Sequence, residues 1–346
     1  MLKYTLKVEM LRKETADTIT VCFKQPALKK VKYQAGQYLT LIFNINGRRY
    51  IRPYSFSSSP GIDPFLEVTV KRVPGGVVSN HIFDKVSVGD LIEVIEPMGD
   101  FVINESIISN NSHVFLWGAG SGITPLFSII KHLLHNHNLK VTLVYGNRNF
   151  ESVIFYDQLT ELAKQYSDAF ALWHFHTQLI VKEDCPNIIQ GRIQTGEVLS
   201  LMNKTNDINN SVHFICGPTG LKESVKKGLN ILNIPAANIY AEDFELVKDE
   251  KELAEIITRS VKIEKDGTCN TLEVTKGKSI LEAGLDALID LPYSCQVGNC
   301  LLCKGKLLNG QLKYAGLETL PTGLQNDEYL LCCTYPLTDD VEVSLN

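Results

Sequence analysis

The pattern of apolar and polar positions divides the chain into three stretches. In residues 1–105, short runs rich in β-branched and aromatic residues, such as TITVCF, QYLTLIF and FLEVTV, are separated by Gly/Pro turns, which predicts strands. In residues 106–245, apolar runs such as HVFLWGAG and KVTLVYGN alternate with segments of helical spacing such as PLFSIIKHLLHN. That alternation predicts a doubly wound parallel sheet covered by helices. From residue 259 to 346 the chain is again rich in predicted strands.

Residues 246–258 lie between the second and third stretches. Their sequence, LVKDEKELAEIIT, begins with a dense charge run and shows no obvious apolar anchor, so we expect a linker and a mobile C-terminal domain. Fourteen basic and 11 acidic residues give residues 1–105 a charge of +3, whereas 8 basic and 12 acidic residues give residues 259–346 a charge of −4. We therefore expect a weak, salt-sensitive attraction between these two stretches.

Composition and charge exclude several classes of protein. The 346 residues are 44% hydrophobic and 21% charged with a net charge of −5, which fits a globular protein of two or three domains and does not favour nucleic-acid binding. No run of about 18 apolar residues is present, so we expect no membrane span. The first residues, MLKYTLKVEM, lack the apolar core of a signal peptide, so we expect a cytoplasmic protein.

The nine cysteines are unevenly placed, with five between Cys295 and Cys333. A bunched, odd set indicates metal or redox chemistry rather than a disulfide framework. Cys295, Cys300 and Cys303 stand in C-x4-C-x2-C spacing, and Cys332 or Cys333 follows about thirty residues later, which is the plant-type spacing of a [2Fe–2S] cluster. A structural zinc site is the alternative, although zinc sites usually pair two C-x2-C hooks and this chain has one.

The remaining cysteines and the histidines show no ligand pattern. Cys22, Cys185 and Cys269 have no partner motif, and we interpret them as structural. His132, His135 and His137 lie on or just after one predicted helix, which we interpret as a solvated helix end.

A glycine-rich segment, GAGSGITP at residues 118–125, follows a predicted buried strand and opens a predicted helix. Glycines let the backbone approach a pyrophosphate, and a helix N-terminus supplies unpaired N–H groups and the positive end of a dipole. The spacing is not the G-x-G-x-x-G fingerprint, so a tight turn without a ligand is the alternative.

Three motif sets resemble those of known families. PYSCQVGNCLLCKGKLLNG, with LLCCTYP downstream, resembles a plant-type ferredoxin domain, although Leu301 stands where that family usually has Gly or Ser. The set GxGxGxxP, YGNRN and CGP resembles the NAD(P)-binding half of the ferredoxin–NADP reductase superfamily. RPYS and GVVSN resemble the R-x-Y-S and G-x-x-S flavin motifs of the same superfamily, and the Asn80 that follows favours FAD over FMN.

The resemblance implies an antiparallel flavin-binding β-barrel over residues 1–105, a doubly wound α/β NAD(P)-binding domain over 106–245, and an α+β plant-type ferredoxin (β-grasp) domain over 259–346. Arg52 is expected to neutralise a flavin phosphate and Tyr54 to stack on the isoalloxazine. Backbone amides of a flexible turn are expected to cradle the pyrophosphate. The expected cofactor-binding residues are Arg52, Pro53, Tyr54, Ser55, Val70, Lys71, Gly76, Val77, Val78, Ser79, Gly118, Gly120, Gly122, Thr124, Pro125, Arg148, Cys216, Gly217 and Pro218.

The resemblance also implies roles for a few further residues. Ser55, Cys216 and Glu242 are expected to form the hydride-transfer site, with a buried, inert thiol as the alternative for Cys216. The expected cluster ligands are Cys295, Cys300, Cys303 and Cys332. Cys332 is chosen over Cys333 because the family's ligand lies four positions before a proline, here Pro336. LLCCTYP reads as a strand, so Cys333 is expected to face the other way.

The order of the motifs, flavin then pyridine nucleotide then iron–sulfur, resembles the reductase subunits of multicomponent oxygenases, including the phenylacetyl-CoA oxygenase type. The resemblance implies transfer from NAD(P)H to FAD, to [2Fe–2S] and then to an oxygenase component. Arg148 favours NADPH, with NADH possible, unless it is a surface arginine without a ligand. Two alternatives stay open. One is the same chemistry with a hybrid-cluster protein, desaturase or cytochrome as acceptor, and the other is a redox sensor or scaffold without turnover.

Overall fold

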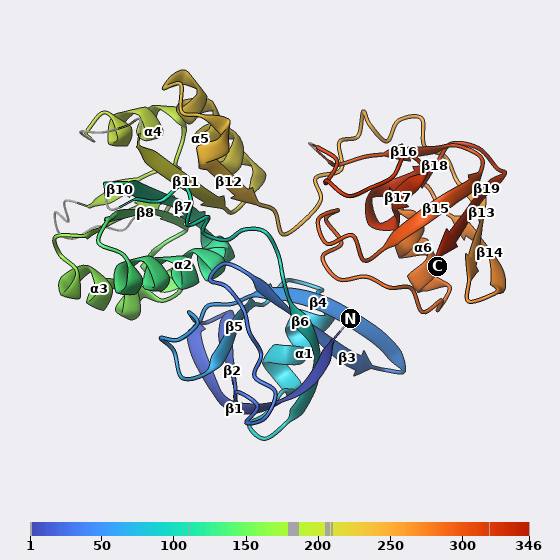
Figure 1. Cartoon of the computed structure of the whole chain (residues 1–346), viewed down its shortest axis with the longest axis horizontal. Helices are drawn as coiled ribbons and strands as arrows, with labels where there is room; N and C mark the ends of the chain where they lie inside the picture. Colours follow the sequence, from blue (N-terminus) through green and yellow to red (C-terminus); the bar gives the residue numbers. More distant parts are fainter. Residues whose placement is uncertain are drawn as a thin grey trace. The chain divides into compact units, whose positions relative to one another are not determined.

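The computed structural model describes residues 2–109, 111–178, 187–204, 208, 210–317 and 319–345. The chain forms two compact units, one of Met1–Phe43 and Pro53–Asp243 and the other of Asn44–Arg52 and Phe244–Asn346. Figure 1 follows the chain from an N-terminal sheet in blue, through a parallel sheet in green, to a C-terminal sheet in orange and red. Each of the three predicted stretches therefore contains one large sheet.

The first sheet is antiparallel and six-stranded, in the order β4-β3-β6-β1-β2-β5. Its strands are β1 (Lys3–Thr15), β2 (Thr18–Phe23), β3 (Tyr38–Ile45), β4 (Arg48–Ser55), β5 (Leu66–Lys71) and β6 (Leu91–Met98). A bridge between Phe56 and Val68 links the end of β4 to β5 and closes the sheet on itself. Inward-facing residues such as Leu6, Val8 and Val21 are almost fully buried. The predicted barrel is confirmed.

One helix interrupts this otherwise β-rich stretch. The sequence predicted strands in residues 1–105 and no helix was expected there, but α1 (Val77–Lys85) follows the turn at Gly75 and Gly76. The physical reason is the apolar spacing of Val78 and Ile82, which places both side chains on the buried face of one helical turn. The proposed G-x-x-S motif therefore opens a helix rather than forming a flexible turn.

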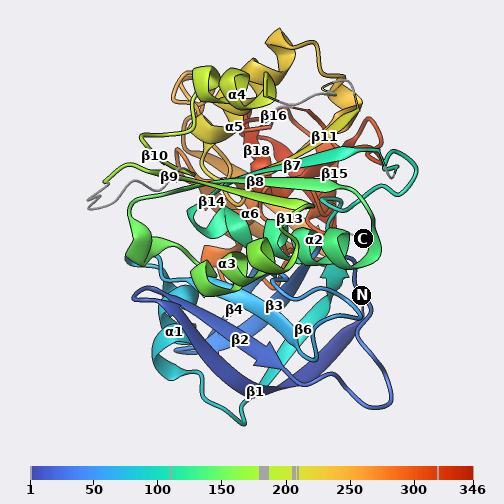
Figure 2. The same cartoon turned by 90° about the vertical axis from the view of Figure 1, so that its left-hand side faces the viewer.

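The second sheet is parallel, in the order β10-β9-β8-β7-β11-β12. Its strands are β7 (His113–Ala119), β8 (Lys140–Asn147), β9 (Phe170–His176), β10 (Ile188–Gln190), β11 (Ser211–Cys216) and β12 (Ile239–Glu242). Figure 2 shows α2 (Ile123–Asn136) and α3 (Tyr156–Gln165) on one face, and α4 (Thr195–Met202) and α5 (Thr219–Ile231) on the other. Separate apolar cores fill the two faces, so the doubly wound prediction is confirmed.

The strand order of the parallel sheet determines where a ligand binds. The chain moves outward from β7 through β8 and β9 to β10, and then returns to the other side of β7 with β11 and β12. Open sheets of this kind bind ligands beyond the carboxyl ends of their strands, at the point where the strand order reverses. The glycine-rich segment and Cys216 both lie at that point, because β7 leads into the short 3-10 turn Gly120–Gly122 and β11 ends at Cys216.

The C-terminal sheet is mixed, in the order β14-β13-β19-β15-β17. Its strands are β13 (Arg259–Lys265), β14 (Thr268–Val274), β15 (Lys304–Asn309), β17 (Glu328–Leu330) and β19 (Val341–Leu345). The helix α6 (Ile280–Asp286) begins at a capping box in which Ser279 and Glu282 exchange hydrogen bonds. A small sheet pairs β16 (Leu312–Tyr314) with β18 (Thr334–Pro336). A helix packed on such a sheet is the predicted β-grasp arrangement.

The segment predicted to be a linker is attached to the C-terminal unit. Leu253 and Ile256 pack with Ala315 and Tyr335, and Ile256 is almost fully buried. The Nζ atom of Lys248 also donates to the carboxylate of Glu282 on α6 at 3.0 Å. The expectation that residues 246–258 lack an apolar anchor is therefore wrong, because two apolar side chains within the charge run find a buried partner surface.

Candidate functional site

The loop that holds the first three clustered cysteines folds back on one sulfur atom. Its backbone enters the left-handed region at Gln296, Gly298 and Leu301. The amides of Val297, Asn299 and Cys300 donate to Sγ of Cys295 at 3.5, 3.4 and 3.4 Å. A hydrogen bond from the Cys300 thiol, together with these amides, outweighs burial and lowers the pKa of Cys295 to about 6. The loop thus stabilises a thiolate at a buried position, as iron ligation requires.

The four predicted ligands form two pairs. The thiols of Cys295 and Cys300 are hydrogen-bonded to one another, and so are those of Cys303 and Cys332. Among the described residues, the one group with three candidate ligand atoms within 4.8 Å of one another contains none of these cysteines. The four sulfurs therefore do not converge on one point. A single zinc ion would need such convergence, whereas a two-iron cluster takes two thiolates on each iron. The donor set therefore fits [2Fe–2S].

The two adjacent cysteines lie in a turn rather than in the predicted strand. A one-turn 3-10 helix, Leu331–Cys333, separates β17 from β18. Successive side chains of a 3-10 turn point about 120° apart, so the expected alternation across a strand is wrong. The two thiols differ in their contacts, since that of Cys332 is hydrogen-bonded to that of Cys303 and the Sγ of Cys333 donates to the carbonyl of Leu330 at 3.5 Å, while the two Sγ atoms lie 3.9 Å apart. Cys332 as the fourth ligand stays a prediction.

Leu301 adopts an uncommon backbone conformation. Its φ is 59°, a region in which a side chain larger than glycine costs roughly 1–2 kcal/mol. This conformation accounts for the small residue that plant-type ferredoxins usually carry after the second ligand. In this chain the loop keeps its shape with a leucine at that position.

The cysteines outside the cluster differ in exposure. Cys22 is fully buried, as a structural cysteine should be. Cys269 is exposed on β14, which is an edge strand, so its interpretation as a structural residue is wrong. Cys185 lies outside the described residues.

The glycine-rich segment passes close to the end of β11. A Cβ atom added to Gly122 would lie 2.1 Å from the carbonyl oxygen of Cys216, so only glycine fits there. Gly120 has a φ of 53°, and its carbonyl accepts a hydrogen bond from the hydroxyl of Tyr145 at 2.9 Å. Thr124 and Pro125 lie in the first turn of α2, where proline fits because its missing N–H has no partner in the helix. Backbone N–H groups are thus presented at a helix N-terminus.

Ser55, Cys216 and Glu242, predicted from separate motifs, lie together. Cys216 pairs with Glu242 on β12 and with Gly118 on β7, so Cys216, Glu242 and Gly118 lie at the same edge of the sheet. The Ser55 hydroxyl, at the end of β4, is hydrogen-bonded to the Glu242 carboxyl. The Oε2 atom of Glu242 is buried and has no partner among the described residues. This corner combines a hydroxyl, a thiol and an acceptor that is not fully used.

Burial determines the ionisation of this corner. It raises the pKa of Glu242 from 4.5 to about 8, and the neighbouring charge of Asp243 acts in the same direction, while the Ser55 hydrogen bond opposes both. Burial also raises the pKa of the Cys216 thiol. At pH 7 the corner is therefore mostly uncharged, with Glu242 as a carboxylic acid and Cys216 as a thiol.

This ionisation predicts how stability depends on pH. Because the pKa of Glu242 is higher in the folded than in the unfolded chain, the folded chain holds one more proton between about pH 4.5 and 8, and its stability falls as the pH rises through that window. In Glu242→Gln this loss is absent. Calorimetry should therefore show the Tm of the variant rising relative to wild type between pH 5 and pH 8. Glu161→Gln, an exposed change on α3, serves as control, and a Glu242→Gln difference that is constant with pH contradicts the assignment.

The flavin motif residues lie at the ends of β4 and β5 and at the start of α1. Gly76 precedes the helix, and the amides of Val77, Val78 and Ser79 form its first turn, which leaves N–H groups without helical partners. The Ser79 hydroxyl is occupied within the turn, since it accepts from the amide of Val73 at 3.1 Å. A pyrophosphate cradle here would rest on backbone amides at a helix N-terminus, which suits an anion. The guanidinium of Arg52 donates to the carbonyl of Ile51 at 2.8 Å.

A group of polar residues that the sequence reasoning missed lies at the carboxyl ends of β8 and β9. Asn147 pairs with His176 and Tyr145 with His174 across the two strands. Asn147 Nδ2, His174 Nδ1 and both ring nitrogens of His176 are buried without a partner among the described residues. Burial lowers the pKa of His174 to about 4, so this ring is neutral at pH 7. The alternation in WHFH was the available signal, because it places both histidines on one face of a strand that ends at the ligand-binding edge.

Comparison with protein families gives matches for all three stretches. Residues 5–103 match the oxidoreductase FAD-binding domain, residues 116–227 the oxidoreductase NAD-binding domain, and residues 263–337 the 2Fe-2S iron-sulfur cluster binding domain. The three matched ranges coincide with the three large sheets. The chain therefore binds FAD, NAD(P)H and a [2Fe–2S] cluster.

Full-length relatives have the same organisation. The chain is 32% identical to the ferredoxin reductase component of 3-ketosteroid-9-alpha-monooxygenase from Rhodococcus rhodochrous, over 98% of this chain and 95% of that protein. It is 30% identical to a subunit of the 1,2-phenylacetyl-CoA epoxidase from Escherichia coli, over 99% and 98%. Phthalate dioxygenase reductase has the same fold, with a TM-score of 0.69 at 22% identity over 99% of this chain and 98% of that chain. The chain belongs to the family of three-domain, NAD(P)H-dependent ferredoxin reductases that includes the reductase components of multicomponent oxygenases.

Proposed function

We propose that this chain oxidises NAD(P)H and delivers the electrons to the oxygenase component of a multicomponent monooxygenase of the phenylacetyl-CoA oxygenase type. The observation that carries the proposal is similarity over nearly the whole chain to components of a monooxygenase and of an epoxidase. Two features of the chain support it. The Ser55–Glu242 contact marks where electrons would enter from NAD(P)H, and the two thiol pairs near the C-terminus mark where they would leave through the cluster.

The residues of this chain position and polarise the reacting groups. FAD, when bound, accepts the two electrons of a hydride and releases them singly to an iron–sulfur centre. Ser55 and Glu242 form a hydrogen-bonded pair at the sheet edge where the nicotinamide would bind, and Cys216 lies beside Glu242. The glycine-rich segment offers its amides to the pyrophosphate, and Tyr145 fixes one of its carbonyls. Cys295, Cys300, Cys303 and Cys332 would hold the cluster.

Arg148 and the neighbouring buried polar residues support a preference for NADPH. Arg148 directly follows β8, beside Asn147 and His176, whose buried nitrogens lack partners among the described residues. A guanidinium at this edge suits a 2′-phosphate, and neutral rings with buried donors suit an adenosine ribose or base. We propose that this group holds the adenosine end of the nucleotide.

Arg148→Ala is expected to raise the KM for NADPH by about tenfold, the loss of one charge-assisted contact, and to leave the KM for NADH within about twofold. Steady-state cytochrome c reduction with each nucleotide measures both values. Lys164→Ala, which removes one exposed positive charge at the last turn of α3, is the matched control and should change neither. A wild-type preference for NADH would assign Arg148 another role.

The acceptor is tested by adding back purified components. NADPH-dependent cytochrome c reduction separates an enzyme from a redox sensor or scaffold, because only an enzyme that turns over reduces cytochrome c continuously at the expense of NADPH. Product formation with an oxygenase component of the phenylacetyl-CoA type then tests the proposed acceptor. Cytochrome c reduction without any oxygenase coupling favours the alternative acceptors, namely a hybrid-cluster protein, a desaturase or a cytochrome.

The proposed location is the cytoplasm. No helix among the described residues is long and apolar enough to span a membrane. The cysteine ligands have to stay reduced to take up iron, which favours a reducing compartment.

A further inference from the structure

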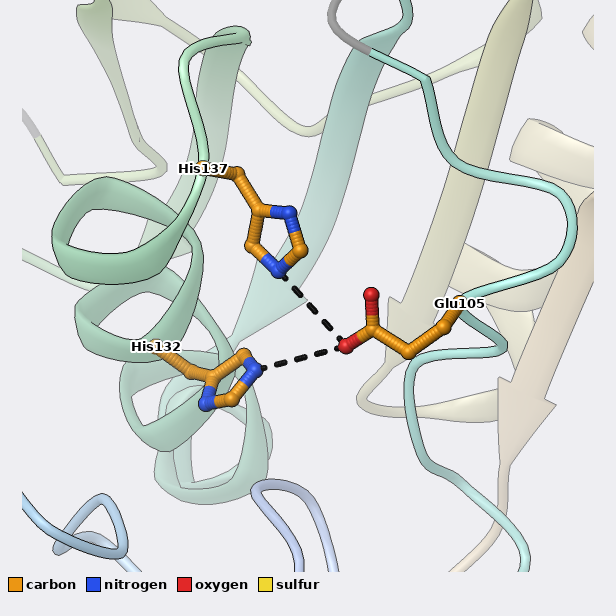
Figure 3. Close-up of side chains that lie close together, drawn as sticks. All are labelled: Glu105, His132 and His137. Atoms are coloured by element: carbon orange, nitrogen blue, oxygen red, sulfur yellow. Dashed lines mark ion pairs between the residues drawn. The ribbon is translucent and has the colours of Figure 1, made fainter.

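Two histidines and a glutamate far from the glycine-rich segment meet at one point. The Nε2 atoms of His132 and His137 each lie 3.6 Å from the same Oε1 atom of Glu105 (Figure 3). One ligand atom from each of the three residues lies within 4.8 Å of the other two. The interpretation of His132, His135 and His137 as a solvated helix end did not include this contact, because Glu105 approaches from a distant part of the sequence.

The backbone fixes each of the three residues. His132 lies one turn before the end of α2, and His137 caps that helix in an extended conformation, with its amide bonded to the carbonyl of Leu133 at 3.0 Å. Glu105 lies in a segment whose isoleucines, Ile103 and Ile107, pack against the core under the parallel sheet. The histidine side chains are 23% and 19% exposed and the glutamate side chain is 62% exposed. The protein therefore covers the group on one side and leaves it open to solvent on the other.

The electrostatics favour a cation at this point. The carboxyl end of α2 contributes the negative end of the helix dipole, and Glu105 adds a carboxylate. Asn136 Nδ2 lies 3.2 Å from the other ring nitrogen of His132 and donates to the His132 carbonyl at 3.0 Å. This contact orients the ring with Nε2 toward Glu105. Metal binding through Nε2 places the ring proton on Nδ1, and the Asn136 side chain then has to turn its amide oxygen toward Nδ1 to accept that proton.

We propose that Glu105, His132 and His137 bind a divalent metal ion such as zinc. Zinc takes histidine nitrogens and carboxylate oxygens at about 2.0–2.2 Å, and two ligands at a tetrahedral angle then lie about 3.4 Å apart. The observed 3.6 Å separations match this spacing closely. These contacts are longer than hydrogen bonds, and with the rings protonated they act as ion pairs that a bound cation would replace. Solvent at the open side completes the coordination.

The site is separate from the hydride-transfer corner. The 14 residues of α2 extend about 20 Å from the glycine-rich segment at its N-terminus to His137 at its other end. A metal ion here would tie the segment that precedes β7 to the end of α2, within the first unit. The expected role is therefore structural, and binding stabilises the folded chain by an amount that grows with the logarithm of the free metal concentration.

Calorimetric titration of the full-length protein, loaded with FAD and cluster, with zinc chloride tests the proposal. Wild type is expected to bind one zinc equivalent that is lost in His132→Ala and in His137→Ala, and weakened in Glu105→Gln. His135→Ala is the matched control, because His135 is an exposed histidine on the last turn of α2 outside the group, and it should bind like wild type. Zinc should also raise the Tm of wild type and His135→Ala only.

Two controls make the outcome unambiguous. The visible absorption of flavin and cluster in each variant shows that the protein is folded and loaded. The difference from the double variant His132→Ala/His137→Ala removes any zinc bound by cysteines elsewhere. The proposal is overturned if wild type binds no more zinc than the double variant, or if His135→Ala loses the site equally.

Discussion

Cys332→Ala is expected to abolish the visible absorption of the cluster and its reduced-state paramagnetic signal while FAD stays bound. The thiol of Cys332 pairs with that of Cys303, so its loss leaves one iron with a single thiolate. Electron delivery to an acceptor that depends on the cluster should fall to background. Absorption and electron paramagnetic resonance spectra of the purified variant, with flavin released and quantified, measure both effects.

Cys333→Ala is the matched control for this prediction. Its thiol donates to the Leu330 carbonyl and lies against the loop at Gly298, where an added Cβ would come within 3.4 Å of Sγ. The variant should keep cluster and flavin and lose about 1 kcal/mol of stability, as expected for removing one small buried group. A variant series in which Cys333→Ala loses the cluster and Cys332→Ala retains it would reverse the assignment of the fourth ligand.

Ser55→Ala is expected to slow flavin reduction by NADPH at least tenfold, which corresponds to about 1.4 kcal/mol in the barrier. The Ser55 hydroxyl is hydrogen-bonded to the buried Glu242 carboxyl, and without it that carboxyl has one fewer partner and is no longer fixed beside the nicotinamide edge. Stopped-flow bleaching of the flavin under anaerobic conditions measures the rate at saturating NADPH.

Ser112→Ala provides the control for Ser55→Ala. Ser112 is also a buried serine, but it lies just before β7, at the amino end of the strand, and bonds to Ser109. Its replacement should leave the bleaching rate at the wild-type value. An unchanged rate in Ser55→Ala would remove Ser55 from the hydride-transfer site, whatever the effect on cofactor content.

Local patterns predicted the sheets well. HVFLWGAG and KVTLVYGN correspond to β7 and β8, and PLFSIIKHLLHN lies within α2, because apolar periodicity reports burial directly. The C-x4-C-x2-C spacing likewise predicted the iron–sulfur domain, since three of the expected ligands lie in one loop. The positions of Ser55, Cys216 and Glu242 followed from family resemblance, and the register of β11 with β12 now gives the physical reason that two of them meet.

Two of the unpredicted features have the same physical cause, which is contact between residues distant in sequence. Leu253 and Ile256 look like isolated apolar positions in a charge run until Ala315 and Tyr335 provide the surface that buries them. Glu105 reaches His132 only because intervening isoleucines anchor its segment. The 3-10 turn at Cys332 is equally invisible to a strand pattern, because its apolar residues remain buried in either conformation.

The central claim is that electrons from NAD(P)H reach the cluster by way of the flavin. Rapid mixing of the anaerobic wild-type protein with NADPH, followed by flavin absorbance and freeze-quenched paramagnetic spectra, tests it most directly. The account predicts that flavin bleaching comes first and that the cluster signal grows in afterwards. It also predicts that Ser55→Ala delays both by the same factor. A cluster signal that rises before the flavin bleaches, or that keeps its wild-type rate in Ser55→Ala, would contradict the proposed order of transfer.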